Sequence, residues 1–316
     1  MTITIDECLP RIKGSRVVVT GGAGFIGSHL VDYLVEKAVE QVVVIDNLTR
    51  PRLDWVKKKA KNHRVIFVNA DITCENITTL FFGADVVFHL AAISRVMVAE
   101  QDPERTFAVN VMGTVKVAKA AHQAEIPRMV FTSSREVYGD PLTLPVKEDA
   151  PRTPKNTYGA SKASAELYLD SSTAKHLEVV TLRLTNVYGP GDIGRVIPTF
   201  IKTALGHEPL VVFGGEQMLD FIWVGDVVEV LIKAAFSQKP PLKPVNVGSG
   251  VALPLRTLSN KVLTLTRNGN FVQIEPSRAP EVERFQADVT LANKYYGLLS
   301  PVDPLEKLPE VLRDFQ

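Results

Sequence analysis

The feature that most constrains this chain is a glycine cluster that directly follows a run of β-branched residues. Residues 16–30 read RVVVTGGAGFIGSHL, which predicts a buried strand, a glycine turn and the start of an amphipathic helix. Gly21, Gly24 and Gly27 fit the spacing G-x-x-G-x-x-G, and Gly22 with the last two fits G-x-G-x-x-G. Glycine allows a tight turn, close approach of the backbone to a pyrophosphate and close packing of helix on strand. Because the motif lies between a strand and a helix, it predicts a dinucleotide-binding loop.

An acid at the end of the next apolar run favours one dinucleotide. The run from Val42 to Ile45 ends at Asp46, 19 residues after Gly27. A carboxylate at this position hydrogen-bonds the ribose 2′-hydroxyl and repels a 2′-phosphate, which predicts NAD rather than NADP as the cofactor. Arg50 keeps NADP as an alternative, because its guanidinium could accept a 2′-phosphate. Asp71 follows the third run, where it either contacts the adenine or is a simple turn residue.

Strand-like runs and helix-like stretches alternate through the first 190 residues. The strand-like runs lie at 16–20, 42–45, 64–68, 84–90, 128–132 and 178–184. Two long stretches, 103–124 and 158–176, have helical spacing. The first carries an apolar stripe at Phe107, Val111, Val115 and Ala118. This alternation predicts parallel βαβ units in an α/β fold, a doubly wound parallel Rossmann sheet.

Charge and cysteine content exclude several classes of protein. Lys and Arg number 36 and Asp and Glu 35, so the net charge of +1 gives no long-range attraction to nucleic acid or an anionic membrane. Cys8 and Cys74 lie far apart, which excludes a disulfide framework and a cysteine zinc site and suits a reducing, cytoplasmic location. No apolar run approaches the roughly 20 residues of a membrane helix. We expect no metal, nucleic acid or membrane as a partner.

A tyrosine and a lysine open the second long helical stretch. Tyr158 and Lys162 are four residues apart, so they lie on one face of the predicted helix. A free tyrosine has a pKa of about 10, and a nearby ammonium group or a positive nicotinamide ring lowers that pKa. The resulting phenolate could remove a proton from a hydroxyl group. Together with the glycine motif, the pair predicts a proton-transfer site.

Several segments together resemble a known family. They are TGGAGFIGSHL, Asp46-Asn47, His89-Leu-Ala-Ala92, Asn110 in FAVNVMGT, SSREVYGDP (133–141), Tyr158-Gly-Ala-Ser-Lys162, RLTNVYGPG (183–191) and DFIWVGDVVEV (220–230). Over roughly residues 14–290 the chain resembles the extended short-chain dehydrogenases/reductases, in the NAD-dependent nucleotide-sugar epimerase/dehydratase branch that includes UDP-glucose 4-epimerases. The resemblance implies a homodimer formed through the two long helical stretches.

The same resemblance implies a division into two parts and a set of cofactor-binding residues. Residues 14–190 with 220–248 would form the NAD-binding Rossmann domain, and residues 191–219 with 249–316 a smaller C-terminal α/β domain that binds the nucleotide sugar. The expected NAD-binding residues are Gly21, Gly24, Phe25, Ile26, Gly27, Asp46, Asn47, Asp71, Ile72, Leu90, Ala91, Ala92, Asn110, Tyr158 and Lys162.

The resemblance also implies a third catalytic residue, a Ser or Thr at the end of the fifth strand. Counting four residues back from Tyr138 gives Ser134, preferred over Ser133, and its hydroxyl would bind the sugar O4. In sugar 4,6-dehydratases an aspartic acid and a glutamate follow, as acid and as C5 base, whereas this chain has Arg135 and Glu136. Arginine stays protonated, which argues against the ordinary dehydratase. Glu136 is either a further catalytic candidate or a polar residue that holds the loop.

The implied substrate is a nucleotide diphosphate sugar. The expected substrate-binding residues are Ser134, Asn186, Arg195 and Arg278, with surface solvation as the competing interpretation of Arg195. Arg284 is also placed to bind phosphate. Leu219 stands where relatives carry an arginine that pairs with the diphosphate, so the anchoring is expected to differ.

The resemblance ranks the possible functions. A 4-epimerase, which oxidises C4 to a transient 4-keto sugar and returns the hydride to the other face, comes first. The alternative is a 4,6-dehydratase or another C5-directed enzyme, including a UDP-glucuronate decarboxylase. A non-catalytic NAD-binding sensor comes last, because a sensor need not retain Ser134, Tyr158 and Lys162.

Overall fold

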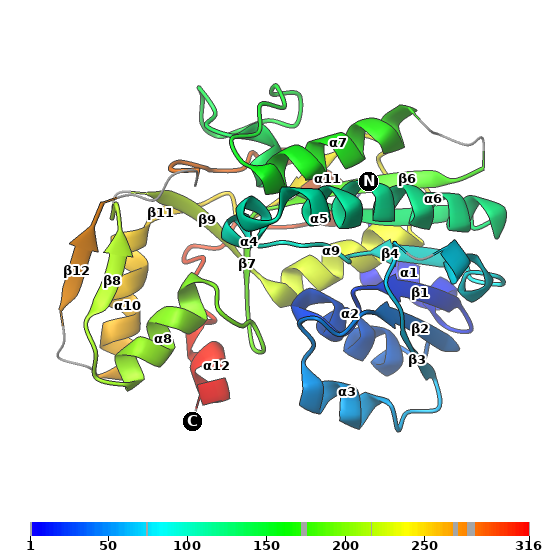
Figure 1. The fold of residues 1–316 in the computed structure, drawn as a ribbon, viewed down its shortest axis with the longest axis horizontal. Helices are drawn as coiled ribbons and strands as arrows, with labels where there is room; N and C mark the ends of the chain where they lie inside the picture. The colour runs from blue at the N-terminus through cyan, green and yellow to red at the C-terminus, as the bar shows by residue number, and fades with distance from the viewer. Residues whose placement is uncertain are drawn as a thin grey trace.

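The computed structural model describes residues 2–73, 75–171, 176–215, 217–267, 271–276 and 282–315. Within them, seven parallel strands form a central sheet in the order β10-β6-β5-β4-β1-β2-β3 (Figure 1). The strands are β1 (Arg16–Thr20), β2 (Gln41–Asp46), β3 (Val65–Asn69), β4 (Val86–His89), β5 (Arg128–Ser134), β6 (Glu178–Leu184) and β10 (Val245–Val247). The winding reverses between β1 and β4, so the predicted doubly wound fold is confirmed.

Nearly uninterrupted apolar runs explain why these strands lie at the centre. β1 reads RVVVT and β2 reads QVVVID, and four successive residues of each are buried. Val18 pairs with Val43 on one side and with Val87 on the other. Helices cover both faces of the sheet, so side chains that point either way leave water, and each such burial contributes about 1.5–3 kcal/mol. The carboxyl ends of the strands therefore share one edge, at which the glycine turn, Asp46 and Ser134 lie.

Helices cover the two faces of the sheet (Figure 1). One core cluster joins the sheet to α1 (Ile5–Ile12), α2 (Phe25–Glu36), α3 (Leu53–Lys59), α9 (Val224–Phe236) and α11 (Thr290–Tyr296). The other joins it to η1 (Glu75–Leu80), η2 (Ala108–Gly113), α6 (Thr114–Gln123) and α7 (Thr157–Ser171), beside which lie α4 (Val96–Gln101) and α5 (Pro103–Phe107). The predicted sheet thus has a helical layer on each face.

The stretch 103–124 differs from the single helix that its spacing predicts. A π-helical segment, η2, separates α5 from α6. Phe107, ahead of the π turn, is exposed, whereas Val117 and Ala121 after it are buried. Of the other residues of the predicted stripe, Ala118 is buried and Val111 and Val115 are half-buried.

The smaller part of the molecule is built on two further sheets. They are β11 (Ala252–Pro254), β9 (Met218–Trp223) and β7 (Asn186–Tyr188), and β12 (Val272–Glu275) with β8 (Leu210–Phe213). A third core cluster packs them against α8 (Val196–Leu205), α10 (Leu255–Thr266) and α12 (Leu308–Leu312), and the short helices η3 (Arg135–Tyr138) and η4 (Arg313–Phe315) complete the elements. Strand β9 crosses the predicted boundary at residue 220, and the division into two domains stays a prediction. In the described ranges, every helix is too short or too polar to span a bilayer.

Candidate active site

The glycine turn after β1 has the geometry that a dinucleotide requires. Gly21 has φ +72°, and its N–H donates to the carbonyl of Ile45 at 2.8 Å. A Cβ on Gly21 would lie 2.7 Å from Ala91 N, and a Cβ on Gly27 would lie 2.6 Å from Gly22 Cα. Helix α2 begins directly after Gly24, which has no side chain to cap the first N–H groups. The turn therefore leaves a backbone cradle and a positive helix end that fit a pyrophosphate.

Asp46 is fixed at the carboxyl end of β2. Its Oδ2 accepts the N–H of Ala23 at 3.0 Å and its Oδ1 accepts the N–H of Leu48 at 2.9 Å. Burial raises the pKa of Asp46, and these two hydrogen bonds oppose the shift. Since Ala23 belongs to the glycine turn, the carboxylate is tied to the pyrophosphate cradle. This arrangement fits a carboxylate that binds a ribose hydroxyl.

The remaining predicted cofactor residues surround the ends of β1, β3 and β4. The Asp71 carboxylate accepts hydrogen bonds from the side chains of Asn47, Thr73 and Arg105. Burial raises the pKa of Asp71, but hydrogen bonds outweigh this effect and lower it to about 2. Ile72 packs on Gly113. The segment with Leu90, Ala91 and Ala92 leaves β4 beside Thr20, because Leu90 N–H donates to the Thr20 carbonyl at 3.1 Å. Phe25 and Ile26 form the first turn of α2.

Asn110 lies in the π-helical segment and fastens the loop after β4. Its Oδ1 accepts the N–H of Ile93 at 2.8 Å, and its Nδ2 donates to the Ile93 carbonyl at 3.0 Å and to Ser161 Oγ at 2.9 Å. The Asn110 side chain thereby links that loop to α7 at Ser161, the residue before Lys162. Asn110 thus acts on the site through backbone positioning.

The structure brings Ser134, Tyr158 and Lys162 together at the end of β5. The Ser134 hydroxyl lies close enough to the Tyr158 phenol to lower its pKa. Ser134 Oγ also accepts Glu136 N–H at 3.2 Å. Lys162 Nζ donates to the Thr132 carbonyl at 2.9 Å and lies 4.8 Å from the centre of the Phe131 ring. Ser134, and not its neighbour Ser133, therefore contacts the tyrosine.

Burial controls the pKa values of the tyrosine and the lysine. Desolvation raises the pKa of Tyr158 to about 12, although the hydrogen bond with Ser134 and the charge of Arg195 lower it. Desolvation also lowers the pKa of Lys162 to about 7, against an opposing effect of Glu166. The pKa of Tyr158 therefore depends on the water lost by the phenolate as well as on the nearby positive charges.

Glu136 is held at both carboxylate oxygens. Arg135 Nη2 contacts Oε1 at 2.9 Å, and Asn156 Nδ2 donates to Oε2 at 2.7 Å. Both members of the Arg135–Glu136 ion pair are buried, and the Arg135 guanidinium lies 5.6 Å from the centre of the Phe285 ring. Asn156 also accepts the N–H of Gly159, which joins Glu136 to the start of α7. The glutamate therefore braces the loop in this structure.

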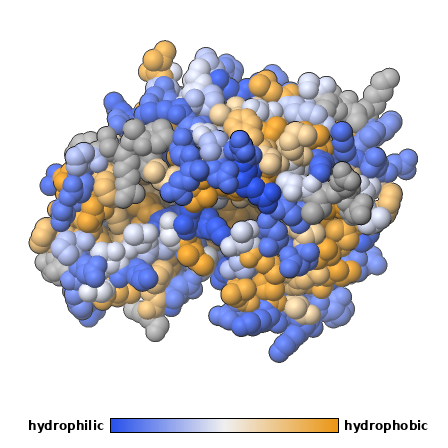
Figure 2. Space-filling view, in the orientation of Figure 1, coloured by the Kyte–Doolittle hydropathy of each residue, from blue (hydrophilic) through white to orange (hydrophobic). Residues whose placement is uncertain are grey.

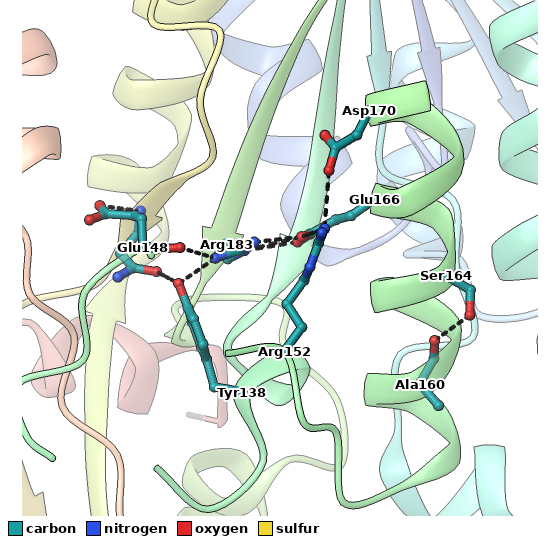
Figure 3. Close-up of polar contacts among 9 residues, drawn as sticks. Tyr138, Glu148, Arg152, Ala160, Ser164, Glu166, Asp170 and Arg183 are labelled. Carbon is teal, nitrogen blue, oxygen red and sulfur yellow. Dashed lines mark hydrogen bonds and ion pairs between the residues drawn. The ribbon is translucent and has the colours of Figure 1, made fainter. Parts of the chain in front are cut away.

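A largely buried polar network joins β6, the loop before α7 and α7 itself (Figure 3). Arg183 on β6 donates to both oxygens of Glu166 on α7, at 2.7–3.3 Å, and to the Tyr138 hydroxyl at 2.7 Å. Arg152 reaches Glu166 and Asp170 from the loop before α7. The network connects the segment that begins at Ser134 to the helix that carries Tyr158 and Lys162. It therefore fixes the spacing of the two catalytic elements.

The predicted substrate-binding residues are only partly brought together. Arg195 pairs with Asp192 at 3.0 Å, and its guanidinium lies 5.7 Å from the centre of the Phe25 ring, beside the cofactor cradle. Asn186 Nδ2 donates to the Asp220 carbonyl at 3.0 Å. Arg278 lies outside the described residues, and the backbone of Arg284 bridges to Met218. Leu219 pairs with Leu253 between β9 and β11.

Two functional candidates escaped the sequence analysis. Asn156 was not singled out, although it binds the carboxylate of Glu136. Arg95 also went unnoticed, although it lies six residues after His89, at the sheet edge where ligands bind in such folds. Its place after a predicted strand was the signal that could have found it.

Comparisons with known proteins agree with this geometry. Residues 17–248 match the model of the NAD dependent epimerase/dehydratase family. The chain is 33% identical to a UDP-glucose 4-epimerase of Mycolicibacterium smegmatis over 95% of this chain and 98% of that protein. It is 32% identical to UDP-glucuronic acid decarboxylase 2 of Arabidopsis thaliana over 96% of this chain and 69% of the relative.

Solved structures give the same picture. The UDP-glucose 4-epimerase of Thermus thermophilus, a complex with NAD, has a TM-score of 0.86 at 31% identity and covers 95% of this chain and 98% of its own. A UDP-N-acetylglucosamine 4-epimerase of Methanobrevibacter ruminantium, in complex with UDP-N-acetylmuramic acid, has a TM-score of 0.87 at 31% identity, with 96% and 98% covered. These are proteins that this chain resembles in both sequence and fold.

Proposed function

Because this chain belongs to the NAD-dependent epimerase/dehydratase family and uses NAD as its cofactor, we propose that it is a nucleotide-sugar 4-epimerase of the UDP-glucose/galactose type. The reaction would pass through a transient 4-keto sugar. The observation that carries this proposal is the state of the active-site carboxylate. Ser134, Tyr158 and Lys162 are assembled for chemistry at a hydroxyl, while Glu136 is bound at both oxygens by Arg135 and Asn156.

Each catalytic residue has a role in moving the proton of the sugar O4. NAD, when bound, supplies the hydride acceptor and a positive charge on its nicotinamide ring. Tyr158 takes the O4 proton as base and returns it after the sugar has turned, and Ser134 shares that proton through its hydrogen bond with the phenol. Lys162 would help to stabilise the phenolate while its ammonium group is protonated, although burial lowers the pKa of that group to about 7.

The ion pair of Glu136 argues against chemistry at C5. A C5 base needs a carboxylate oxygen that is free to take a carbon-bound proton. Here Oε1 is paired with a guanidinium and Oε2 accepts an amide, within a buried site. Releasing Glu136 would leave the buried Arg135 uncompensated, and breaking a buried pair in this way costs about 3–5 kcal/mol. Epimerisation at C4 needs no such release.

Product analysis separates the epimerase from its alternatives. The protein would be mixed with UDP-glucose, UDP-galactose, UDP-glucuronate and their N-acetyl forms, and the products identified by mass and NMR. An unchanged mass with inversion at C4 supports the proposal. Loss of water would indicate a dehydratase, and loss of carbon dioxide would indicate a decarboxylase, the activity named for a relative at 32% identity. No turnover of any of these sugars would favour a sensor.

Two variants test the assignment of roles. Tyr158→Phe removes the base and should lower turnover by about 10²–10⁴-fold while NAD stays bound, because general acid–base groups contribute in that range. Glu136→Gln should lower turnover much less, since epimerisation at C4 does not use this carboxylate, although loss of the ion pair with Arg135 should lower the stability of the protein. Both are run in deuterated water. Deuterium at C5 in the wild-type product that disappears in Glu136→Gln would refute the epimerase and favour C5-directed chemistry.

A further inference from the structure

Three arginines from separate parts of the chain meet around the loop before α8. Arg50 Nη2 donates to the Ile193 carbonyl at 3.0 Å, and Arg95 Nη2 donates to the same oxygen. Arg195 follows two residues later. A Cβ on Gly194 would collide with the Arg95 guanidinium, so that group is seated directly on this loop. We infer that Arg50, Arg95 and Arg195 form a site for the pyrophosphate of the nucleotide sugar.

Among the residues that the structure describes, one carboxylate forms an ion pair with this arginine cluster. The carboxylate that pairs within it is Asp192, which binds Arg195 at 3.0 Å. Three guanidinium groups and one carboxylate leave a charge of +2. The Ile193 carbonyl that Arg50 and Arg95 share is neutral, so it satisfies hydrogen bonds without removing the repulsion between two cations. Consistent with this, burial lowers the pKa of Arg50, and Arg95 and Arg195 lower it further.

Two further observations point to an anionic ligand at the arginine cluster. In the part of the chain that the structure describes, Arg95 Nε is buried and has no hydrogen-bond partner. Helix α8 begins at Val196, directly after Arg195, with no side-chain cap and no acidic residue in its first turn. The positive end of this helix therefore adds to the charge of the cluster. Figure 2 shows both hydrophilic and hydrophobic residues along the hollow between the two parts of the molecule.

A pyrophosphate dianion fits this arrangement better than a single phosphodiester. Its two negative charges match the charge of +2, and guanidinium groups bind phosphate oxygens in pairs of parallel hydrogen bonds. A dinucleotide also contains a pyrophosphate, but the glycine turn and α2 already form a cradle for that one. The arginine cluster lies on the loop that follows β7, and the Arg195 guanidinium lies 5.7 Å from the centre of the Phe25 ring, beside the cradle. We therefore assign it to the sugar nucleotide, an assignment that rests on the proposed function.

Binding of UDP and of inorganic pyrophosphate to the NAD-loaded protein tests the inference by calorimetry, without any turnover. Arg95→Gln should weaken UDP binding about 10- to 100-fold, the range expected for losing charge-assisted hydrogen bonds. Arg95→Gln should change the affinity for uridine little. The UDP affinity of Arg95→Lys should lie between those of the wild type and Arg95→Gln. Arg64→Gln is the matched control, because Arg64 precedes β3 at the opposite edge of the sheet. Circular dichroism confirms that each variant is folded.

Three results would overturn the inference. The first is an unchanged UDP affinity in both Arg95→Gln and a second variant, Arg50→Gln. Equal weakening of uridine and UDP would show that the pyrophosphate is not what the arginines bind. Loss of bound NAD with unchanged UDP affinity would assign the cluster to the pyrophosphate of the cofactor. Because binding is measured without catalysis, weaker UDP binding in a protein that epimerises no sugar would refute the proposed function and leave the pyrophosphate site standing.

Discussion

Replacing Glu166 by glutamine tests whether the buried network behind the active site holds the fold together. The glutamate is fully buried and receives hydrogen bonds from Arg183 at 2.7, 3.0 and 3.3 Å. Glutamine has nearly the same shape, so Glu166→Gln removes a charge without leaving a cavity. Arg183, with 3% of its surface exposed, would then lose the carboxylate to which it is hydrogen-bonded, and Glu148 would be the acid left to act on its charge.

The expected loss follows from that uncompensated charge. Removing one partner of a buried ion pair destabilises a protein by about 3–5 kcal/mol, a large share of the roughly 5–15 kcal/mol that separate folded from unfolded chains. Asp170→Asn is the matched control. It makes the same chemical change one turn further along α7 and touches the same Arg152, but half of the Asp170 side chain is exposed. An exposed pair contributes about 0–1 kcal/mol.

Urea unfolding of the NAD-loaded protein measures both variants, with the slope of each transition checked against the wild type. Equal losses for Glu166→Gln and Asp170→Asn, or a loss below about 1 kcal/mol for the former, would refute the reasoning. A rise in stability would show that desolvation of the two charges costs more than their attraction returns.

Gly27→Ala should abolish retention of NAD, because a Cβ there would lie 2.6 Å from Gly22 Cα. Gly206→Ala is the control and should keep the cofactor, because its Cβ would lie 3.4 Å from the nearest atom. The amount of NAD released on denaturation measures both. Burial lowers the pKa of Lys162 to about 7, whereas an ordinary lysine has a pKa of about 10.4. Between these two pH values Lys162 binds fewer protons in the folded protein than in the unfolded chain. The contribution of Lys162 to the free energy of unfolding should therefore rise with pH through that window, by at most about 1.4 kcal/mol per pH unit. Lys162→Met should remove the rise. A difference in the free energy of unfolding between wild type and Lys162→Met that does not change with pH would contradict this. We also expect a homodimer that forms through α5–α6 and α7, because Leu167 on α7 keeps 55% of its surface exposed. Light scattering should give twice the mass of one chain, and the mass of a single chain would reject the dimer.

The cofactor half of the site was predictable because its rules are local. The glycine spacing, the β-branched run before it and the acid that ends β2 each act over a few neighbouring residues. The structure accordingly places Gly21, Gly27 and Asp46 around one turn. The order of the central strands could be predicted for a similar reason, since parallel strands with helical crossovers have few ways to wind.

The arginine cluster and the bound state of Glu136 depend instead on contacts between distant segments. Arg50 follows β2 and Arg95 follows β4, and only folding brings both to the Ile193 carbonyl. Glu136 meets Asn156 across 20 residues of chain. The pKa of Tyr158 also depends on how much water the phenolate loses, whereas spacing along a helix indicates only which charges are near.

The π turn at Ala108–Gly113 has a consequence for how this chain can change in length. A π turn takes up one residue more than an α-helical turn, so deleting one residue here would restore ordinary helix geometry while Val117 and Ala121 of α6 stay in the core. Asn110 lies inside the segment and would lose its register with Ile93. The added residue is therefore hard to lose once the active site depends on it. Alignments of relatives should place their gaps in the surrounding loops and leave this segment unbroken.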